Sequence, residues 1–124
     1  MPARKPEDLD PLFAQSLNAG GLDALMALYE PGATLTPSPG KNVTGTAAIR
    51  EALGGFLAMK PRMTLTSKVL ALAGDLALGT ASWQLEGVGS DGVAVSLKGQ
   101  SVEVLRRQAD GRWLFAIDNP WGIG

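Results

Sequence analysis

The chain of 124 residues contains no cysteine and no histidine. Without cysteine, there is no disulfide framework, no thiolate nucleophile and no thiolate metal site. Without histidine, the commonest general base and metal ligand is missing, which excludes Ser-His-Asp and Cys-His catalysis and the usual zinc sites. Acid–base chemistry must therefore come from Asp, Glu, Tyr, Lys or water. The sequence predicts no metal and no cofactor.

Long apolar runs and clustered charge are also lacking. No run approaches the length of a membrane span, and the N-terminal stretch lacks the apolar core of a secretory signal. We therefore expect a cytoplasmic protein that does not bind membranes. The formal net charge is −1, and the only local basic group comprises Arg106, Arg107 and Arg112. Nucleic-acid binding needs a clustered basic face, so we interpret this group as the solvated end of a hairpin and expect no nucleic-acid partner.

The chain is long enough to bury a core, and 45% of its residues are hydrophobic. It shows no internal repeat and no linker, so residues 1–124 are predicted to form a single domain. Apolar spacing predicts three helices in the N-terminal half. Asp10 is the expected N-cap of the first helix and Thr46 that of the third. Tyr29 falls on the apolar stripe of the second, as a core residue with a satisfied hydroxyl. The helices are expected within 7–19, 22–29 and 46–60.

After the third helix, β-forming runs alternate with short turns. Strands are expected at 33–36, 62–72, 76–86, 93–107 and 112–119. The Pro/Gly-rich segment 37–45 is predicted to be a loop that either rims a pocket or merely connects its neighbours. Helices followed by long strands predict an α+β fold, in which a strongly curved antiparallel sheet wraps three N-terminal helices.

Two acids, Glu103 and Asp118, occupy strand positions where apolar residues are expected. They lie on the two strands that flank the turn at Asp110-Gly111. Each acid is either a cavity carboxylate with a raised pKa, fit for general acid or base chemistry, or a structural acid. As a structural acid, Glu103 would pair with a basic side chain or an indole N–H, and Asp118 with the backbone at the strand exit.

Strand alternation predicts which side chains accompany these acids. Glu103 is expected between Ser101 and Leu105 on its own face. Asp118 is expected to share a face with Leu114 and Ala116, while Trp113, Phe115 and Ile117 take the other. Both faces of the last strand are thus largely apolar, which indicates that it is covered on both sides.

Three motifs occur in the order LNAGGLDALMALYEPGATLTPSPG, TGTAAIREAL and VEVLRRQADGRWLFAIDNPWG. With these motifs the chain resembles the nuclear transport factor 2-like superfamily, and within it the SnoaL-like and ketosteroid-isomerase-like bacterial proteins. The resemblance covers nearly the whole chain. It implies a cystatin-like cone: a curved sheet wrapped around helices, open at one end. It also implies a homodimer that pairs through the outer face of the sheet.

The superfamily includes isomerases, cyclases, dehydratases, epoxide hydrolases and binding modules, so the resemblance does not fix an activity. Ketosteroid isomerases use a carboxylate base with a tyrosine and a protonated aspartic acid as oxyanion donors. By the resemblance, the tyrosine position falls at Phe13, the base falls at or near Pro37, and only the second acid has a counterpart, Glu103. Steroid-type isomerisation is therefore not expected.

The resulting hypothesis is a small-molecule protein with an apolar ligand in the cone. It is either a cofactor-independent isomerase, cyclase or hydrolase, or a non-catalytic ligand-binding or dimerisation module. Glu103 and Asp118 are the candidate catalytic residues. For Trp83 and Trp121, the alternative roles are core packing or a dimer interface. Each is a large side chain with an indole N–H that needs a partner. The candidate ligand-binding residues are Phe13, Trp83, Asn119 and Trp121.

Overall fold

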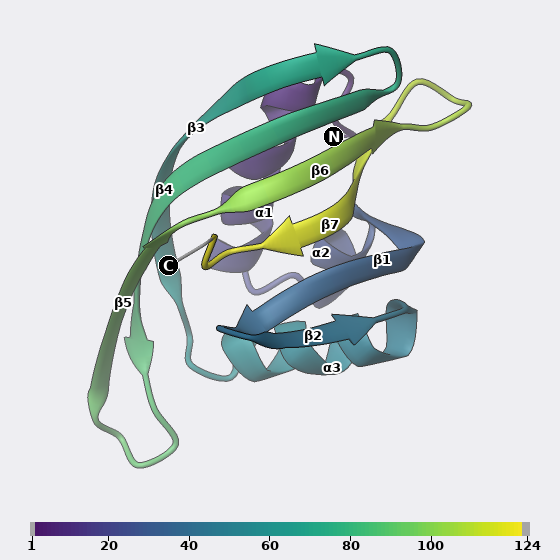
Figure 1. Cartoon of the computed structure of the whole chain (residues 1–124). Coiled ribbons are helices and arrows are strands. Elements are labelled where there is room, and N and C mark those ends of the chain that lie inside the picture. The colour runs from purple at the N-terminus through teal and green to yellow at the C-terminus, as the bar shows by residue number, and fades with distance from the viewer. Residues whose placement is uncertain (1, 123–124) are drawn as a thin grey trace.

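A seven-stranded sheet curls around the helices, which lie on its concave side (Figure 1). The computed structural model describes residues 2–122. Among these residues, every helix is too short or too polar to span a bilayer. The predicted α+β class and the curved sheet are confirmed.

The three predicted helices are present, and a 3₁₀ turn precedes the first. The turn η1 spans Pro6–Asp8. Helices α1, α2 and α3 span Leu9–Asn18, Leu22–Met26 and Thr46–Leu57. The pair Gly54-Gly55 lies inside α3 and does not break the helix. Ile49 and Leu53, on the inner stripe of α3, are fully buried against the sheet and α2 and stabilise the helix.

The helix ends differ from prediction at three residues. Helix α1 begins before Asp10, which lies in its first turn and is not the N-cap. A proline is tolerated in the first helical turn, so Pro11 permits this earlier start. Tyr29 lies beyond α2 and is the first residue of a strand. Thr46 is the first residue of α3, with Gly45 at the N-cap position.

The sheet order is β2-β1-β7-β6-β4-β3, and β5 pairs with the second half of β4. All neighbouring pairs are antiparallel except β1 and β7, which run parallel. The sheet is therefore mixed, which corrects the prediction of a wholly antiparallel one. β1 and β7 are far apart in the chain, so no hairpin constrains their relative direction. The strands are β1 (Tyr29–Ser38), β2 (Lys41–Thr44), β3 (Arg62–Ala73), β4 (Leu76–Val88), β5 (Ala94–Gln100), β6 (Val102–Arg107) and β7 (Trp113–Asn119).

The segment 37–45, predicted as a loop, contains the turn between β1 and β2 and the whole of β2. Gly40 supplies the positive φ of 79° that the turn needs. Hydroxyl contacts tie the two strands together, including one of 2.8 Å between Thr34 and Thr44. None of these residues lines the cavity described below. The segment connects its neighbours and does not rim the pocket.

The predicted strand 93–107 is two strands, because Ser101 interrupts it. The Ser101 N–H donates to the Ala81 carbonyl oxygen (2.8 Å), and its own carbonyl accepts from the Thr80 hydroxyl (2.6 Å). Both halves still pair with β4, β5 on one side of Ser101 and β6 on the other. The interruption lets the sheet bend strongly at this point, as Figure 1 shows where β5 departs from β6.

A bulge at Ala116 changes which side chains of β7 face inward. Leu105 of β6 pairs with Phe115, whereas the preceding Val104 pairs with Ile117, so one residue of β7 is extra. Phe115 and Asp118 consequently share the inner face, and Ile117 is 46% exposed. The predicted grouping of Asp118 with Leu114 and Ala116 is wrong, because strict alternation does not survive a bulge.

Candidate functional site

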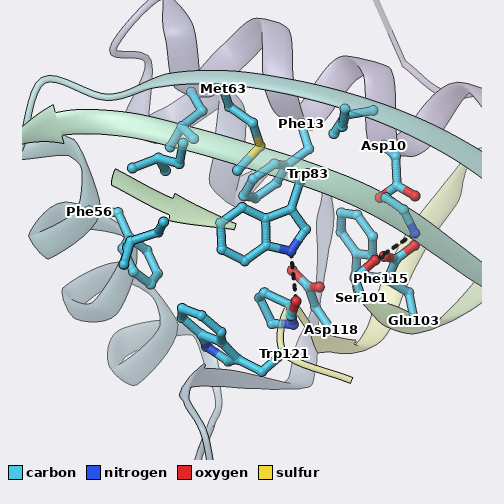
Figure 2. A pocket seen from close by; sticks show the side chains of 16 residues that line it. Asp10, Phe13, Phe56, Met63, Trp83, Ser101, Glu103, Phe115, Asp118 and Trp121 are labelled. Carbon is cyan, nitrogen blue, oxygen red and sulfur yellow. Dashed lines mark hydrogen bonds between the residues drawn. The ribbon is translucent and has the colours of Figure 1, made fainter. Parts of the chain in front are cut away.

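A small cavity lies between α1, α3 and the concave face of the sheet (Figure 2). Its volume is about 60 Å³. Since one buried water needs roughly 10–15 Å³ of such space, the cavity as it stands admits only a few heavy atoms. Apart from four polar side chains near one another, its lining is apolar. The lining residues are Asp10, Phe13 and Leu17 of α1, Phe56 of α3, Met63, Leu65, Ala81, Trp83, Leu85 and Leu97 of β3 to β5, then Ser101, Glu103, Phe115, Asp118, Pro120 and Trp121.

Glu103 lies inside the cavity and is only 2% exposed, on the inner face of β6 as predicted. Its Oε2 accepts a hydrogen bond from the Ser101 hydroxyl, which itself accepts the Ala81 N–H at 2.8 Å. Among residues 2–122, its Oε1 has no hydrogen-bond partner of regular geometry. Gly79 of β4 is the cross-strand partner of Glu103, and a Cβ at Gly79 would lie 3.1 Å from the Glu103 Oε1. The glycine therefore leaves room for the carboxyl group.

Asp118 is the cross-strand partner of Glu103, and it is buried in the same cavity. Directly opposed residues on one face have Cβ atoms about 4.5–5.5 Å apart. The Asp118 Oδ2 accepts a hydrogen bond of 2.5 Å from the hydroxyl of Tyr29. Tyr29 is thus a core residue with a satisfied hydroxyl, as predicted, although it reaches this place from β1 and not from a helix.

Asp10 is the third acid of the cavity, and the sequence interpretation missed it. It reaches the cavity from the first turn of α1, and Figure 2 shows its carboxyl group directed toward Ser101 and Glu103. The signal was present in the spacing, because Asp10, Phe13 and Leu17 fall at i, i+3 and i+7 and therefore share one helix face. As an N-cap, Asp10 would lie outside the helix, so this prediction did not count it with Phe13 and Leu17.

Burial and mutual repulsion raise the pKa values of all three carboxyl groups. The pKa of Glu103 is raised to about 9, mainly by burial and further by the hydrogen bond with Asp10 and the charge of Asp10. Burial also raises the pKa of Asp118 to about 7, with the Glu103 charge adding and the Tyr29 hydrogen bond opposing. For Asp10, burial raises the pKa to about 6, while the Glu103 hydrogen bond opposes the change. Near pH 7, Glu103 therefore holds a proton while Asp10 is largely ionised, and the group offers an acid and a base together.

Aromatic rings form much of the remaining wall. The indole N–H of Trp83 donates to the Pro120 carbonyl oxygen (2.7 Å), and its ring meets Trp121 edge to face with centroids 5.2 Å apart. Phe13 meets Phe115 in the same manner at 6.2 Å. Three of the four predicted ligand-binding residues, Phe13, Trp83 and Trp121, therefore line the cavity.

Asn119, the fourth predicted ligand-binding residue, does not line the cavity. Its side-chain oxygen accepts the N–H groups of Trp121 and Gly122, and its amide donates to the Gly122 carbonyl. Asn119 closes the turn after β7, where both ends of its side-chain amide are engaged with the backbone. Within residues 2–122, no three His, Cys, Asp or Glu side chains are grouped so as to hold a metal ion.

The family model of the SnoaL-like domain matches residues 12–115. This stretch includes Glu103 but neither Asp10 nor Asp118. Two of the three cavity acids thus lie just outside the matched stretch, one at each end.

Solved structures with the same fold share little sequence with this chain. A ketosteroid isomerase-like protein from Erwinia carotovora atroseptica is 20% identical, with a TM-score of 0.81 over 95% of this chain and 93% of its own. An NTF2-like protein with a cystatin-like fold from Novosphingobium aromaticivorans is 18% identical, with a TM-score of 0.77 over 94% and 79%. SalBIII, an epoxide hydrolase/cyclase-like enzyme with a role in pyran ring formation in salinomycin, is 18% identical, with a TM-score of 0.71 over 94% and 89%. These likenesses establish the fold.

Proposed function

Because the chain belongs to the SnoaL-like domain family, we propose that it is a cofactor-independent acid–base enzyme acting on a small, largely apolar molecule in the cavity. The observation that carries this proposal is the group of carboxyls formed by Asp10, Glu103 and Asp118 inside an apolar cavity. An apolar pocket with a few convergent polar groups of perturbed pKa is the usual form of an active site.

Each acid has a role that its environment supports. Glu103, which keeps its proton at neutral pH, is the general acid and donates to a substrate oxygen. Asp118, with a pKa of about 7, is the general base. Tyr29 orients Asp118 by its hydrogen bond of 2.5 Å, so it is a positioning residue. Asp10 holds the proton of Glu103 in place and completes the set.

The reaction classes that fit are proton transfer within a substrate, ring closure, and addition or loss of water. All three need only a donor and an acceptor on either side of the reacting atoms. The epoxide hydrolase/cyclase-like enzyme that shares this fold makes water addition and ring closure reasonable first choices. The tyrosine and base positions implied by ketosteroid isomerases fall at Phe13 and near Pro37, so steroid-type isomerisation is not proposed.

A panel of small neutral substrates tests the proposal. Purified protein is incubated with a C4 to C6 epoxide, a β-hydroxyketone and a ketone in D₂O, and products or deuterium incorporation are followed by proton NMR. We expect one class to turn over, and Glu103→Gln and Asp118→Asn each to lower the rate by about 10²-fold or more, the usual contribution of a positioned acid or base.

Matched surface substitutions serve as controls. Glu51→Gln and Asp23→Asn change exposed acids on α3 and α2, and they should leave the rate unchanged. Turnover that survives unaltered in both cavity variants would contradict the assignment. Turnover lost equally in the surface variants would show that it depends on something other than the cavity.

The small cavity volume favours an alternative, a non-catalytic module whose cavity is simply a well-packed polar core. About 60 Å³ leaves little room for a substrate unless Phe56 or Trp121 moves. Both side chains are only partly buried, and both form part of the cavity wall. No turnover across the panel, together with no binding of any panel member, would favour the alternative.

We further propose that the chain forms a homodimer through the outer face of the sheet. Leu78, Val104 and Ile117 are consecutive cross-strand neighbours on β4, β6 and β7. Ile117 is 46% and Leu78 is 38% exposed. A row of exposed apolar side chains across three strands is typical of an interaction surface.

The cytoplasmic location expected from the sequence stays a prediction.

A further inference from the structure

We propose that the ligand of this cavity is a small organic cation, such as a protonated primary amine, held between the carboxyl groups and the aromatic rings. The inference rests on the proposed function, because it names the chemical class of substrate for the same site. It is argued from charge, from the Oε1 atom of Glu103 and from the composition of the wall.

The first argument is an imbalance of charge. Three carboxyl groups line the cavity, but no lysine or arginine does. Buried carboxylates are normally paired with a cation. In the part of the chain that the structure describes, every ion pair lies outside the cavity: Arg50–Asp23, Arg106–Glu30, Arg107–Asp75 and Arg112–Asp110. Whatever negative charge develops in the cavity has to be balanced by protons or by a cation from outside.

The second argument is the Oε1 atom of Glu103. This side chain is 2% exposed and faces the cavity, and Oε1 has no regular hydrogen-bond partner among residues 2–122. In the free protein, Oε1 is satisfied only by the proton that Glu103 shares with the carboxyl group of Asp10. A primary ammonium carries three N–H donors, so it can take the place of that proton and donate to both carboxylates.

The third argument is the aromatic wall, which suits an organic cation better than a metal ion. Five rings line the cavity, and a cation is attracted to the face of such rings while its hydrocarbon part is buried against them. Figure 2 shows Phe56 and Trp121 across the cavity from Asp10 and Glu103. The five are Phe13, Phe56, Trp83, Phe115 and Trp121.

The cavity of about 60 Å³ limits the probes to a few heavy atoms. Isobutylammonium, isobutanol and isobutyrate share one hydrocarbon skeleton and differ in charge. An alkylammonium keeps its charge to a pKa of about 10, as the lysine side chain does. The three probes therefore compare a cation, a neutral molecule and an anion near neutral pH.

The experiment follows the indole N–H signals of ¹⁵N-labelled protein during titration with each probe. Trp83 and Trp121 line the cavity, whereas Trp113 does not and serves as an internal reference. We expect isobutylammonium to shift the first two signals saturably at pH 8, with a Kd at least tenfold lower than that of isobutanol. Isobutyrate should not shift them.

Two variants localise the charge effect. Asp10→Asn and Asp118→Asn should each raise the Kd for isobutylammonium at least fivefold and leave the Kd for isobutanol unchanged, which also shows that the cavity is intact. Asp23→Asn, on the surface, should change neither. Amine binding should weaken as the pH falls from 8 to 5, because Asp10 and Asp118 then take up protons. The other titratable groups of the cluster, Glu103 and the buried Tyr29, already hold their protons at pH 8 in the free protein.

Isobutanol binding as tightly as the amine, or amine binding that is equal in the wild type and both variants, would overturn the inference. So would the absence of a shift with all three probes. The proposed function is judged separately: turnover of a neutral panel substrate that needs Glu103 and Asp118 would stand even if the amine does not bind.

Discussion

Glu103 and Asp118 face each other across β6 and β7, and both carboxyl groups point into the same apolar cavity. Two carboxyl groups this close in an apolar place cannot both ionise easily, so at least one holds its proton. Asp10 adds a third acid from α1. A cluster that resists ionisation makes the stability of the whole fold depend on pH, and that dependence has a definite sign.

We expect the free energy of unfolding to fall as pH rises from about 4 to about 9. The pKa values of Asp10, Asp118 and Glu103 are about 6, 7 and 9 in the folded protein, against 3.8 for Asp and 4.5 for Glu ordinarily. Folded protein thus retains protons that the unfolded chain has released. The stabilisation is complete below the ordinary values and is lost through the raised ones. Urea unfolding should show a decrease on the order of 5–10 kcal/mol between pH 5 and pH 9, most of it from Glu103.

Glu103→Gln provides the control for this pH dependence. A glutamine stays neutral at every pH, so the decrease between pH 7 and pH 9 should shrink, while Glu51→Gln should retain it. Stability that stays flat from pH 5 to pH 9 in the wild type would show that the three acids are solvated and not enclosed.

Tyr29→Phe should destabilise the protein more at pH 8 than at pH 5. The variant removes the 2.5 Å hydrogen bond to the buried Asp118, and this bond lowers the Asp118 pKa. An ionised, buried carboxylate without its donor costs about 1–3 kcal/mol, whereas a protonated one costs less. Urea unfolding at the two pH values measures the difference. An equal loss at both would indicate that the hydroxyl acts through packing alone.

Two glycines give opposite predictions upon replacement by alanine. A Cβ at Gly99 would lie 2.8 Å from the ring of Trp83, so Gly99→Ala should destabilise by about 1–3 kcal/mol through overpacking. A Cβ at Gly54, inside α3, meets nothing within 4 Å, so Gly54→Ala should stabilise by about 0.5–1 kcal/mol. Thermal unfolding of the two variants against the wild type measures both. Gly99→Ala without effect would mean that Trp83 shifts freely, and the cavity wall with it.

Features with regular spacing could be predicted from the sequence. The apolar stripe of α3 and the inward position of Glu103 follow from periods of 3.6 and 2, and the structure has both. The long antiparallel strands were also predictable, because short turns such as Asp110-Gly111 fix their partners. The resemblance to a known family added the open cone and, with it, the presence of a cavity.

What could not be predicted depends on local departures from those periods. The bulge at Ala116 changes which face Ile117 and Asp118 occupy on β7. No residue type between Trp113 and Asp118 predicts this bulge. Asp10 was assigned to a helix cap because Asp followed by Pro is a strong start signal, and tertiary packing prevailed over it. The parallel pairing of β1 and β7 is non-local, so no turn signal exists for it.

Ile117→Arg should convert the proposed dimer to a monomer. The bulge at Ala116 turns Ile117 to the outer face, where it is 46% exposed beside Val104. Burying an arginine in an apolar interface without a partner is unfavourable, while in a monomer the same side chain stays in water and costs little. Light scattering at micromolar concentration should give twice the monomer mass for the wild type and the monomer mass for the variant. Thr64→Arg, on the outer face of β3 away from the apolar row, should remain dimeric. A monomeric wild type would contradict the proposed dimer. A dimer in both variants would place the interface elsewhere.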